Sequence, residues 1–230
     1  MKKLVIIGVV VLALLPVADR VAVRVADSTI ATQLRKSAHL TATPSVSITG
    51  FPFLTQAVAG KYDEIDVTAR DLERGGVRIA KLSVALHGVH VPLADVVQGN
   101  VKSIPVDRMV GAAVVTYADL GNRSGLVNVS ITPDGDHVQV TARLSVFGQS
   151  VTATAVSSVS LAGDVIVLTA RSLKALGQTS PALINALTGR LDLHIPVGTL
   201  PYDLRLTGVV VTAGGLEISA ESGPVVLQTG

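Results

Sequence analysis

The sequence predicts an α+β protein in which antiparallel strands outnumber helices. Three stretches alternate apolar and polar residues on either side of a short turn that contains Gly, which is typical of β-hairpins. They span residues 126–146, 151–170 and 204–220. One segment, from Asp19 to about His39, instead repeats apolar residues at helical spacing. Val and Thr, which favour strands, contribute 38 and 19 of the 230 residues.

The chain begins with a segment typical of export signals. Lys2 and Lys3 precede an apolar run from Leu4 to Leu15, and a basic start before about 7–15 apolar residues characterises secretory signals. Extended to Ala18, the run would form about 22 Å of helix, which is shorter than the roughly 30 Å hydrocarbon core of a bilayer. We therefore expect residues 1–18 to be a signal peptide or a signal-anchor, and residues 19–230 to form one domain. A buried N-terminal core element is the alternative.

The segment after Asp19 is predicted to be an amphipathic helix that ends before Pro44. Its apolar stripe has spacings of 3, 4 and 4 residues and comprises Val23, Ala26, Ile30 and Leu34. The basic residues on its other faces are Arg20, Arg24, Arg35 and Lys36. Such a helix would bury one side against the strands and expose its charges.

Shorter alternating runs predict strands between this helix and the first hairpin. These runs cover residues 45–49, 65–69, 77–91, 101–106 and 109–116; the last two are weaker, and a helix is the alternative for 109–116. Pro at the first helical position predicts short helices at Pro92–Val97 and Ser180–Leu187. Tyr117–Leu120 is expected to form a short turn, and Gly50–Leu54 a loop.

Some strands are apolar at every position, as in Val165–Leu168 and Val209–Val211. Continuous apolar runs indicate strands that are buried on both faces. The predicted helices are too few to cover every strand. We therefore interpret one apolar face of the sheet as packed on the helices, and the other apolar face as the lining of a groove for lipid. A β-sandwich without cargo is the alternative.

The composition argues against several classes of function. Cys is absent, which excludes thiol enzymes, Cys-based metal sites and disulfide scaffolds. A net charge of +2 and six dispersed aromatic residues give no platform for nucleic acid. No Gly-x-Ser-x-Gly elbow and no Gly-rich phosphate loop occurs. We expect no enzymatic activity, no cofactor and no nucleic-acid partner.

The remaining polar clusters also have simple structural interpretations. His87 and His90 form a close pair, but residues three apart on a strand point to opposite faces, and zinc needs further ligands. Asp63, Glu64 and Asp66 are expected to form an exposed strand edge rather than an acid–base pair. We therefore expect no metal site and no catalytic residue.

The candidate binding residues are apolar groups in segments expected at the surface. Gly50–Leu54 places two of the three Phe in one loop, and large apolar groups on loops mark interaction sites unless one of them fills the core. Basic residues on the first helix suit anionic head groups, although a solvated face is the alternative. The lipid-binding candidates are Phe51, Phe53, Leu54, Val23, Ile30, Leu34, Leu183, Leu187, Leu200 and Tyr202. The head-group or membrane-surface candidates are Arg20, Arg24, Arg35 and Lys36.

An ordered series of short motifs connects these segments to a known family. It runs through Ala18–Arg20, Gly50–Leu54, Gly60–Tyr62, Gly88–Leu93, Tyr117–Leu120, Ile195–Tyr202, Leu206–Val209 and Gly214–Leu216. In these motifs the chain resembles the LmeA-like phospholipid-binding proteins of the actinobacterial cell envelope, over roughly Ala18 to Leu227. No motif is specific alone, but chance would not keep their order.

The resemblance implies a tubular lipid-binding (BPI-like) fold. In that fold a long N-terminal helix lies along a strongly curved, mainly antiparallel sheet, and lipid tails occupy the apolar groove between them. The resemblance further implies binding of a phospholipid or a phosphatidylinositol-type glycolipid, contact with a membrane surface, and a role in maintaining mannosylated envelope lipids.

We therefore expect an exported lipid carrier or chaperone at the outer face of the cytoplasmic membrane or in the cell envelope, either anchored or released. One alternative is a membrane-anchored envelope scaffold without lipid cargo. Another is an envelope hydrolase with a dispersed site.

Overall fold

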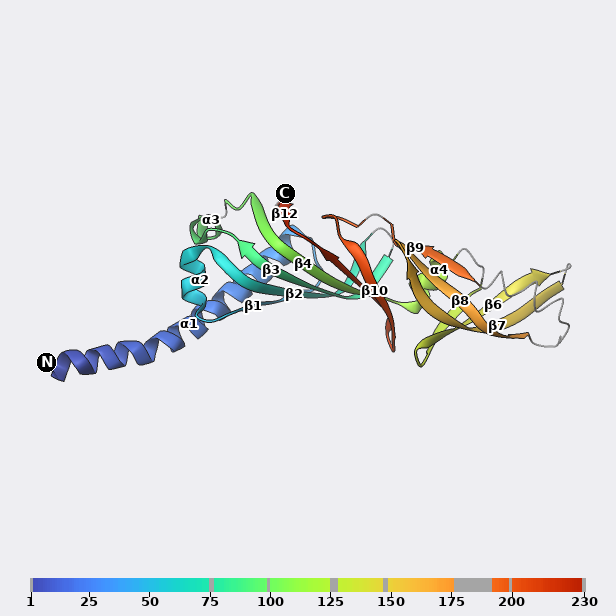
Figure 1. Cartoon of the computed structure of the whole chain (residues 1–230), viewed down its shortest axis with the longest axis horizontal. Coiled ribbons are helices and arrows are strands. Elements are labelled where there is room, and N and C mark those ends of the chain that lie inside the picture. Colours follow the sequence, from blue (N-terminus) through green and yellow to red (C-terminus); the bar gives the residue numbers. More distant parts are fainter. Residues whose placement is uncertain are drawn as a thin grey trace. The chain divides into compact units, whose positions relative to one another are not determined.

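The computed structural model describes residues 2–74, 77–98, 100–124, 128–146, 149–175, 192–198 and 200–228 (Figure 1). The expected α+β class is confirmed: strands that pair antiparallel predominate, and one long helix stands at the N-terminus. The chain divides into two compact units. Unit 1 comprises Met1–Arg70, Ser83–Gly111 and Ser222–Gly230, and unit 2 comprises Asp71–Leu82 and Ala112–Glu221.

Helix α1 spans Lys2–Ser37. The sequence predicted a helix beginning at Asp19, and this boundary is wrong, because the apolar run before Asp19 is helical as well and continues into it without a break. In Figure 1 the first part of α1 extends past α2. In the described part of the chain, no helix is both long enough and apolar enough to cross a membrane. His39 closes α1 in the left-handed conformation, so that the Leu40 amide donates to the Arg35 carbonyl.

Two short helices belong to unit 1. Helix α2 spans Phe53–Ala59 and helix α3 spans Leu93–Gln98. The expected loop at Gly50–Leu54 is therefore only partly correct, because the chain turns into α2 at Phe53. The helix predicted at Pro92–Val97 is confirmed by α3 within one residue. Gly60 ends α2 in the left-handed conformation, which Gly adopts without a Cβ penalty.

One sheet has the strand order β1-β2-β3-β4-β11-β10, and β12 also pairs with β4. Its strands are β1 (Ser45–Thr49), β2 (Lys61–Arg74), β3 (Val77–His90), β4 (Ser103–Val115), β10 (Arg205–Thr212), β11 (Gly215–Ser222) and β12 (Val225–Gln228). Strands β2, β3, β4 and β11 contribute residues to both units. The two weak strands predicted around Pro105 and Ala112 are one continuous strand, β4.

The core of unit 1 lies between α1, α2 and the sheet. The β1–β2 register places Val46 opposite Val67 and Ile48 opposite Ile65, so that these four side chains share one face. Buried residues of this core are Val23, Ile48, Phe53, Ala57, Tyr62, Val89, Val91 and Val106. Of the stripe predicted on α1, Val23, Ala26 and Ile30 pack on this core, and Leu34 is half-buried.

Unit 2 contains a second, five-stranded sheet of order β5-β6-β7-β8-β9. Its strands are β5 (Ser130–Asp134), β6 (His137–Val146), β7 (Gln149–Ala162), β8 (Val165–Ala175) and β9 (Leu193–Pro196), and helix α4 spans Tyr117–Arg123. The three predicted hairpins are confirmed as β5–β6, β7–β8 and β10–β11. The turn expected at Tyr117–Leu120 is the start of α4.

The apolar strand Val165–Leu168 has two different faces. Ile166 and Leu168 are at most 1% exposed and belong to the core of unit 2, whereas Val165 and Val167 are half-buried. The alternating residues of β6, from Val138 to Ala142, are fully buried in the same core. Unit 2 is thus packed on one face of this sheet, and the other face carries β-branched and hydroxyl side chains with intermediate exposure.

Candidate functional site

The apolar face of unit 1 is only partly covered. Val23 and Ala31 of α1 are buried, but Ala26, Ile30 and Leu34 remain half-buried on the same helix. Further half-buried apolar residues pack on the same core from α3, β2, β3, β4, β12 and the segment before β4. They are Ile65, Leu86, Val96, Val101, Ile104, Val225 and Leu227. Together with Ala26, Ile30 and Leu34, these residues form what we call the α1-flanking apolar surface. Its members keep part of their apolar area accessible to a ligand.

Two carboxylates attach α1 to its neighbours. Asp27 Oδ1 accepts the backbone N–H of Ile48 at 2.9 Å, which satisfies an amide of the edge strand β1. Asp19 Oδ1 accepts the backbone N–H of Leu54 at 2.8 Å. Burial raises the pKa of Asp27, and the hydrogen bond from Ile48 offsets only part of that effect. These contacts fix α1 by hydrogen bonds along the side that meets β1 and α2.

The Asp19 contact serves as a helix cap. The N-cap residue of α2 is Pro52, which makes no side-chain hydrogen bond to the helix. The free N–H groups at a helix start need an acceptor, and a carboxylate also interacts favourably with the positive end of the helix dipole. Asp19 is only 2% exposed and supplies this acceptor from α1. A residue thirty-five positions away therefore orders the start of α2.

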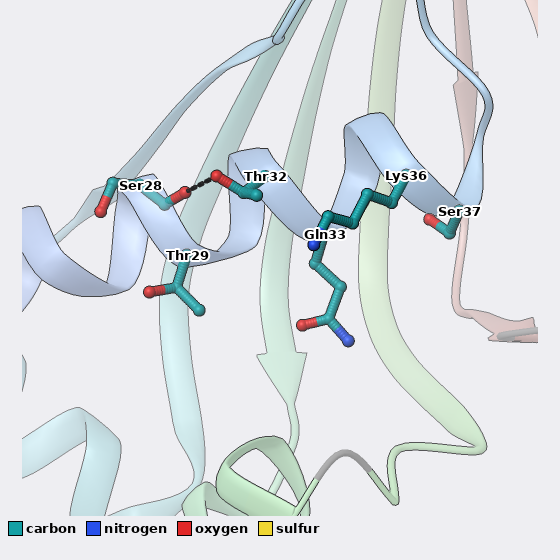
Figure 2. A pocket seen from close by; sticks show the side chains of 6 residues that line it. All are labelled: Ser28, Thr29, Thr32, Gln33, Lys36 and Ser37. Carbon is teal, nitrogen blue, oxygen red and sulfur yellow. Dashed lines mark hydrogen bonds between the residues drawn. The ribbon is translucent and has the colours of Figure 1, made fainter.

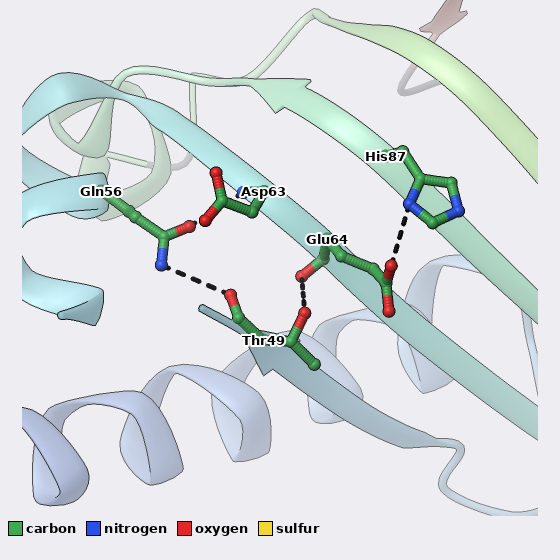
Figure 3. A network of polar contacts seen from close by, with 5 residues as sticks. All are labelled: Thr49, Gln56, Asp63, Glu64 and His87. Carbon is green, nitrogen blue, oxygen red and sulfur yellow. Dashed lines mark hydrogen bonds and ion pairs between the residues drawn. The ribbon is translucent and has the colours of Figure 1, made fainter. Parts of the chain in front are cut away.

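Gln56 holds the other side of the same segment (Figure 3). Its Nε2 donates to the Thr49 carbonyl at 3.3 Å, and its Oε1 accepts the Asp63 N–H at 2.8 Å. The Thr49 hydroxyl in turn donates to the Glu64 carbonyl at 3.3 Å. Because Gln56 is buried, both ends of its amide need these partners. The network ties α2 to β1 and β2 and so fixes the segment that carries Phe51 and Phe53.

The two Phe residues of this segment have different positions. Phe53 is 6% exposed and packs near Tyr62, with 6.2 Å between ring centroids. Burial raises the pKa of the Tyr62 phenol. Phe51 is 60% exposed, and the Arg20 guanidinium lies 5.0 Å from its ring centroid, within cation–π range. Phe53 therefore fills the core, as the alternative interpretation allowed, whereas Phe51 remains available at the surface.

A polar hollow of about 730 Å³ lies beside the C-terminal half of α1 (Figure 2). Its lining residues are Ser28, Thr29, Thr32, Gln33, Lys36 and Ser37. The hydroxyls of Ser28, Thr29 and Thr32 donate to carbonyls of their own helix, which leaves their lone pairs available as acceptors. In Figure 2 Thr29 and Gln33 point away from the helix to the same side. The hollow offers acceptors, an amide and one ammonium group to a polar ligand.

The remaining sequence candidates are dispersed. Arg24, Arg35 and Lys36 are exposed on α1, and only Lys36 lines the hollow. Leu200 is half-buried and Tyr202 exposed, both in unit 2. The candidates Leu183 and Leu187, with the helix predicted around them, lie outside the described residues.

Asp19, Asp27 and Gln56 are positioning residues that the sequence patterns did not identify. A signal for the two acids was present, because Asp19, Val23 and Asp27 are spaced by four and so share the buried side of α1. An acid on an apolar helix face needs a partner, although spacing does not say which one.

The two His residues have separate partners. His87 Nδ1 lies 2.9 Å from Glu64 Oε2, and His90 Nε2 lies 3.5 Å from Asp107 Oδ1. Glu64 and Asp107 are on different strands, β2 and β4. Among the described residues, no group of three His, Asp or Glu side chains is arranged to hold a metal ion.

The motifs that carry the family resemblance coincide with these structural features. Asp19 and Arg20 contact the segment at Phe51–Leu54, and Gly60 closes α2 against the start of β2. A family model described as LmeA-like phospholipid-binding matches residues 17–221. The chain belongs to the LmeA-like phospholipid-binding family. This membership supports lipid binding and a phospholipid partner. No curated protein and no solved structure matches the chain.

Proposed function

We propose that this LmeA-like protein is a non-catalytic phospholipid carrier or lipid chaperone, and that acyl chains bind along the α1-flanking apolar surface of unit 1. The observation that carries the proposal is the set of half-buried apolar residues that pack around the core of unit 1 and stay partly exposed. Family membership supports the class of ligand. The proposed groove is the space that tails would occupy between α1 and the strands.

The energetics suit a carrier of varied lipids. Each buried CH₂ contributes about 0.8 kcal/mol, so affinity would grow with the length of chain in contact. Aliphatic walls impose no directional requirement, and selectivity would therefore come from the head group. The polar hollow along Ser28–Ser37 is the proposed head-group region, because it combines hydroxyl acceptors with Lys36. A phosphatidylinositol-type glycolipid would satisfy these acceptors through its ring hydroxyls.

The proposed location is the outer face of the cytoplasmic membrane or the cell envelope. A basic start followed by the apolar run Leu4–Leu15 supports export, with the segment either cleaved or retained as an anchor. An envelope carrier would collect lipid from the membrane and present it elsewhere in envelope or lipoglycan maintenance. This context, like the carrier role, is part of the proposal.

The decisive experiment is lipid analysis of the protein purified from a membrane-containing host. Native mass spectrometry should show a bound lipid, and lipid-free protein should take up a fluorescent phospholipid from liposomes. Ala26→Phe would fill space on the α1-flanking apolar surface and should lower uptake by about tenfold. Ala118→Phe, at an exposed position of α4, is the matched control and should leave uptake unchanged.

An envelope scaffold without cargo is the second candidate, and the buried core of the described part of unit 2 favours it for that unit. It predicts protein that is free of lipid in every preparation and takes up no labelled phospholipid. That result would contradict the carrier proposal. Equal uptake by the wild type and Ala26→Phe would instead remove the α1-flanking apolar surface as the place of binding.

A further inference from the structure

The exposed apolar side chains of the described residues are unevenly distributed. Eleven large apolar residues are exposed, and eight of them lie in two short segments, 14–25 and 51–58. The eight are Leu14, Leu15, Val17, Val21, Val25, Phe51, Leu54 and Val58. Val58 is the most exposed at 86%. Concentration of exposed apolar groups in one region marks an interaction site, whereas scattered single residues do not.

Direct contacts join the two segments into one surface, which we call the α1–α2 surface. Asp19 Oδ1 binds the Leu54 N–H at 2.8 Å, and Arg20 stacks on Phe51 at 5.0 Å. Leu54 and Val58 are four residues apart and therefore lie on the same side of α2. The surface is thus presented by two helices that are fixed to each other, and no ordering of a loop is needed before it binds.

The outward side of α1 changes character along its length. Leu14, Val17, Val21 and Val25 follow one another at spacings of 3, 4 and 4, so they form an exposed apolar stripe. From Ser28 onward the same side carries the hydroxyl and amide groups of the polar hollow. The apolar stripe therefore ends at a defined position, and toward the N-terminus it continues into the apolar run Leu4–Leu15 of the same helix.

The charges of the α1–α2 surface have one sign. Within residues 14–25 and 51–58 the exposed charged side chains are Arg20 and Arg24. The acid in these segments, Asp19, is buried and bonded to Leu54, and just beyond them the exposed Lys61 and Asp63 of β2 carry opposite charges. A second copy would bring the same positive charges against this surface. Anionic head groups would complement them.

We propose that the α1–α2 surface docks unit 1 on a bilayer that contains anionic phospholipid. Phe51, Leu54 and Val58, with Val21 and Val25 of the α1 stripe, enter the interfacial region, and Arg20 and Arg24 contact phosphate groups. This inference rests on the proposed function and deepens it, because docking through α1 brings the α1-flanking apolar surface to the lipid source. The proposal assigns membrane contact to residues of α1 up to Val25, and not to Arg35 or Lys36 near the C-terminal end of the helix.

The absence of native Cys permits a direct test in the full chain. Val58→Cys and Val210→Cys each create one attachment point for an environment-sensitive dye, and Val210, 59% exposed in unit 2, is the matched control. Vesicles of phosphatidylcholine with about 30% phosphatidylglycerol should shift the emission of the dye at position 58 to the blue. Pure phosphatidylcholine should do so less, and position 210 should not respond.

Charge variants provide the second measurement. Arg20→Gln combined with Arg24→Gln should raise the lipid concentration for half-maximal response at position 58 by about tenfold or more. No emission shift at position 58, or an equal shift at position 210, would overturn the docking proposal. So would a vesicle response that is unaffected by the double charge variant, and so would concentration-dependent self-association that Val58→Asp abolishes while vesicle binding is unchanged.

The same preparations separate this inference from the proposed function. Val58→Asp alters docking but lies outside the α1-flanking apolar surface, so co-purified lipid should remain while the vesicle response falls. Wild-type protein that docks but never carries or takes up lipid would refute the carrier proposal and leave the docking surface in place. Protein that carries lipid but gives no dye response at position 58 would refute the docking surface and leave the carrier proposal in place.

Discussion

Asp19 offers the sharpest test of how α1 organises the candidate site. Its Oδ1 accepts the Leu54 N–H at 2.8 Å, whereas its buried Oδ2 has no hydrogen-bond partner among the described residues. Asp19→Ala removes the acceptor from the start of α2, where Pro52 offers no replacement. Asp19→Asn keeps an oxygen in place and exchanges the unpaired oxygen for an amide group. The two variants therefore separate the hydrogen bond from the charge.

The magnitude follows from opposing contributions. A hydrogen bond to a charged acceptor contributes about 1.5–3 kcal/mol, and loss of an N-cap costs about 0.5–2 kcal/mol. Both values describe the same contact and are not added. Removing a buried carboxylate also relieves its desolvation, so we expect Asp19→Ala to lower the free energy of unfolding by about 1–2 kcal/mol. For a chain of this size, that corresponds to about 4 °C in Tm. Asp19→Asn should cost about half as much.

Urea unfolding followed by circular dichroism gives the stability, and hydrogen exchange with mass spectrometry gives its location. Peptides covering residues 51–60 should exchange faster in Asp19→Ala, while peptides from β6 and β7 should not change. Asp136→Ala, in the exposed turn after β5, is the control. If Asp19→Ala unfolds like the wild type and residues 51–60 keep their protection, the capping role is refuted.

Three further changes test other parts of the fold. Phe53→Ala should cost about 3–5 kcal/mol in thermal or urea unfolding because it empties the core of unit 1, and a loss below about 1 kcal/mol would contradict its placement. Asp27→Asn should be at least as stable as the wild type at pH 7, because burial raises the pKa of the Asp27 carboxyl above its usual range and so disfavours the ionised form. As the pH falls through the pKa of Asp27 in the folded protein, the wild type becomes more stable, and the difference in free energy of unfolding between it and Asp27→Asn should shrink. A difference that grows as the pH falls would contradict the prediction. Gly215→Ala should destabilise unit 2 by about 2 kcal/mol or more, since φ is +156° and an added Cβ would overlap the Val115 carbonyl oxygen, whereas Gly214→Ala, with open space around it, should be tolerated.

Local patterns in the sequence were sufficient for much of the architecture. The hairpins depend on adjacent segments and a short turn, so alternation around Gly135 and Gly163 predicted the pairs β5–β6 and β7–β8. The stripe around Val23 predicted which side of α1 is buried. Helix boundaries were less predictable, because Pro16, which would commonly end or kink a helix, stands just before Asp19, yet α1 continues through it.

The candidate site depends on contacts that local patterns do not encode. Phe51 and Phe53 are the same residue type and lie two positions apart in the sequence. Phe51 is nevertheless exposed, whereas Phe53 is buried in the core. Their difference arises because α2 begins at Phe53, and that start is capped by Asp19 from a distant segment. Contacts between remote segments depend on the whole fold, and a single sequence does not identify the partner.

The way α1 is attached also explains how apolar area can remain accessible beside it. A helix held on a sheet only by apolar packing must bury most of its apolar stripe to be stable, because each contact is weak. Here Asp19 and Asp27 contribute directional hydrogen bonds on the side toward α2 and β1. Ile30 and its neighbours across the sheet can then stay half-buried without loss of the helix position. The hydrogen bonds of Asp19 and Asp27, which the sequence patterns did not reveal, thus allow the predicted apolar surface to stay partly exposed. Asp19→Ala should therefore alter lipid uptake as well as stability.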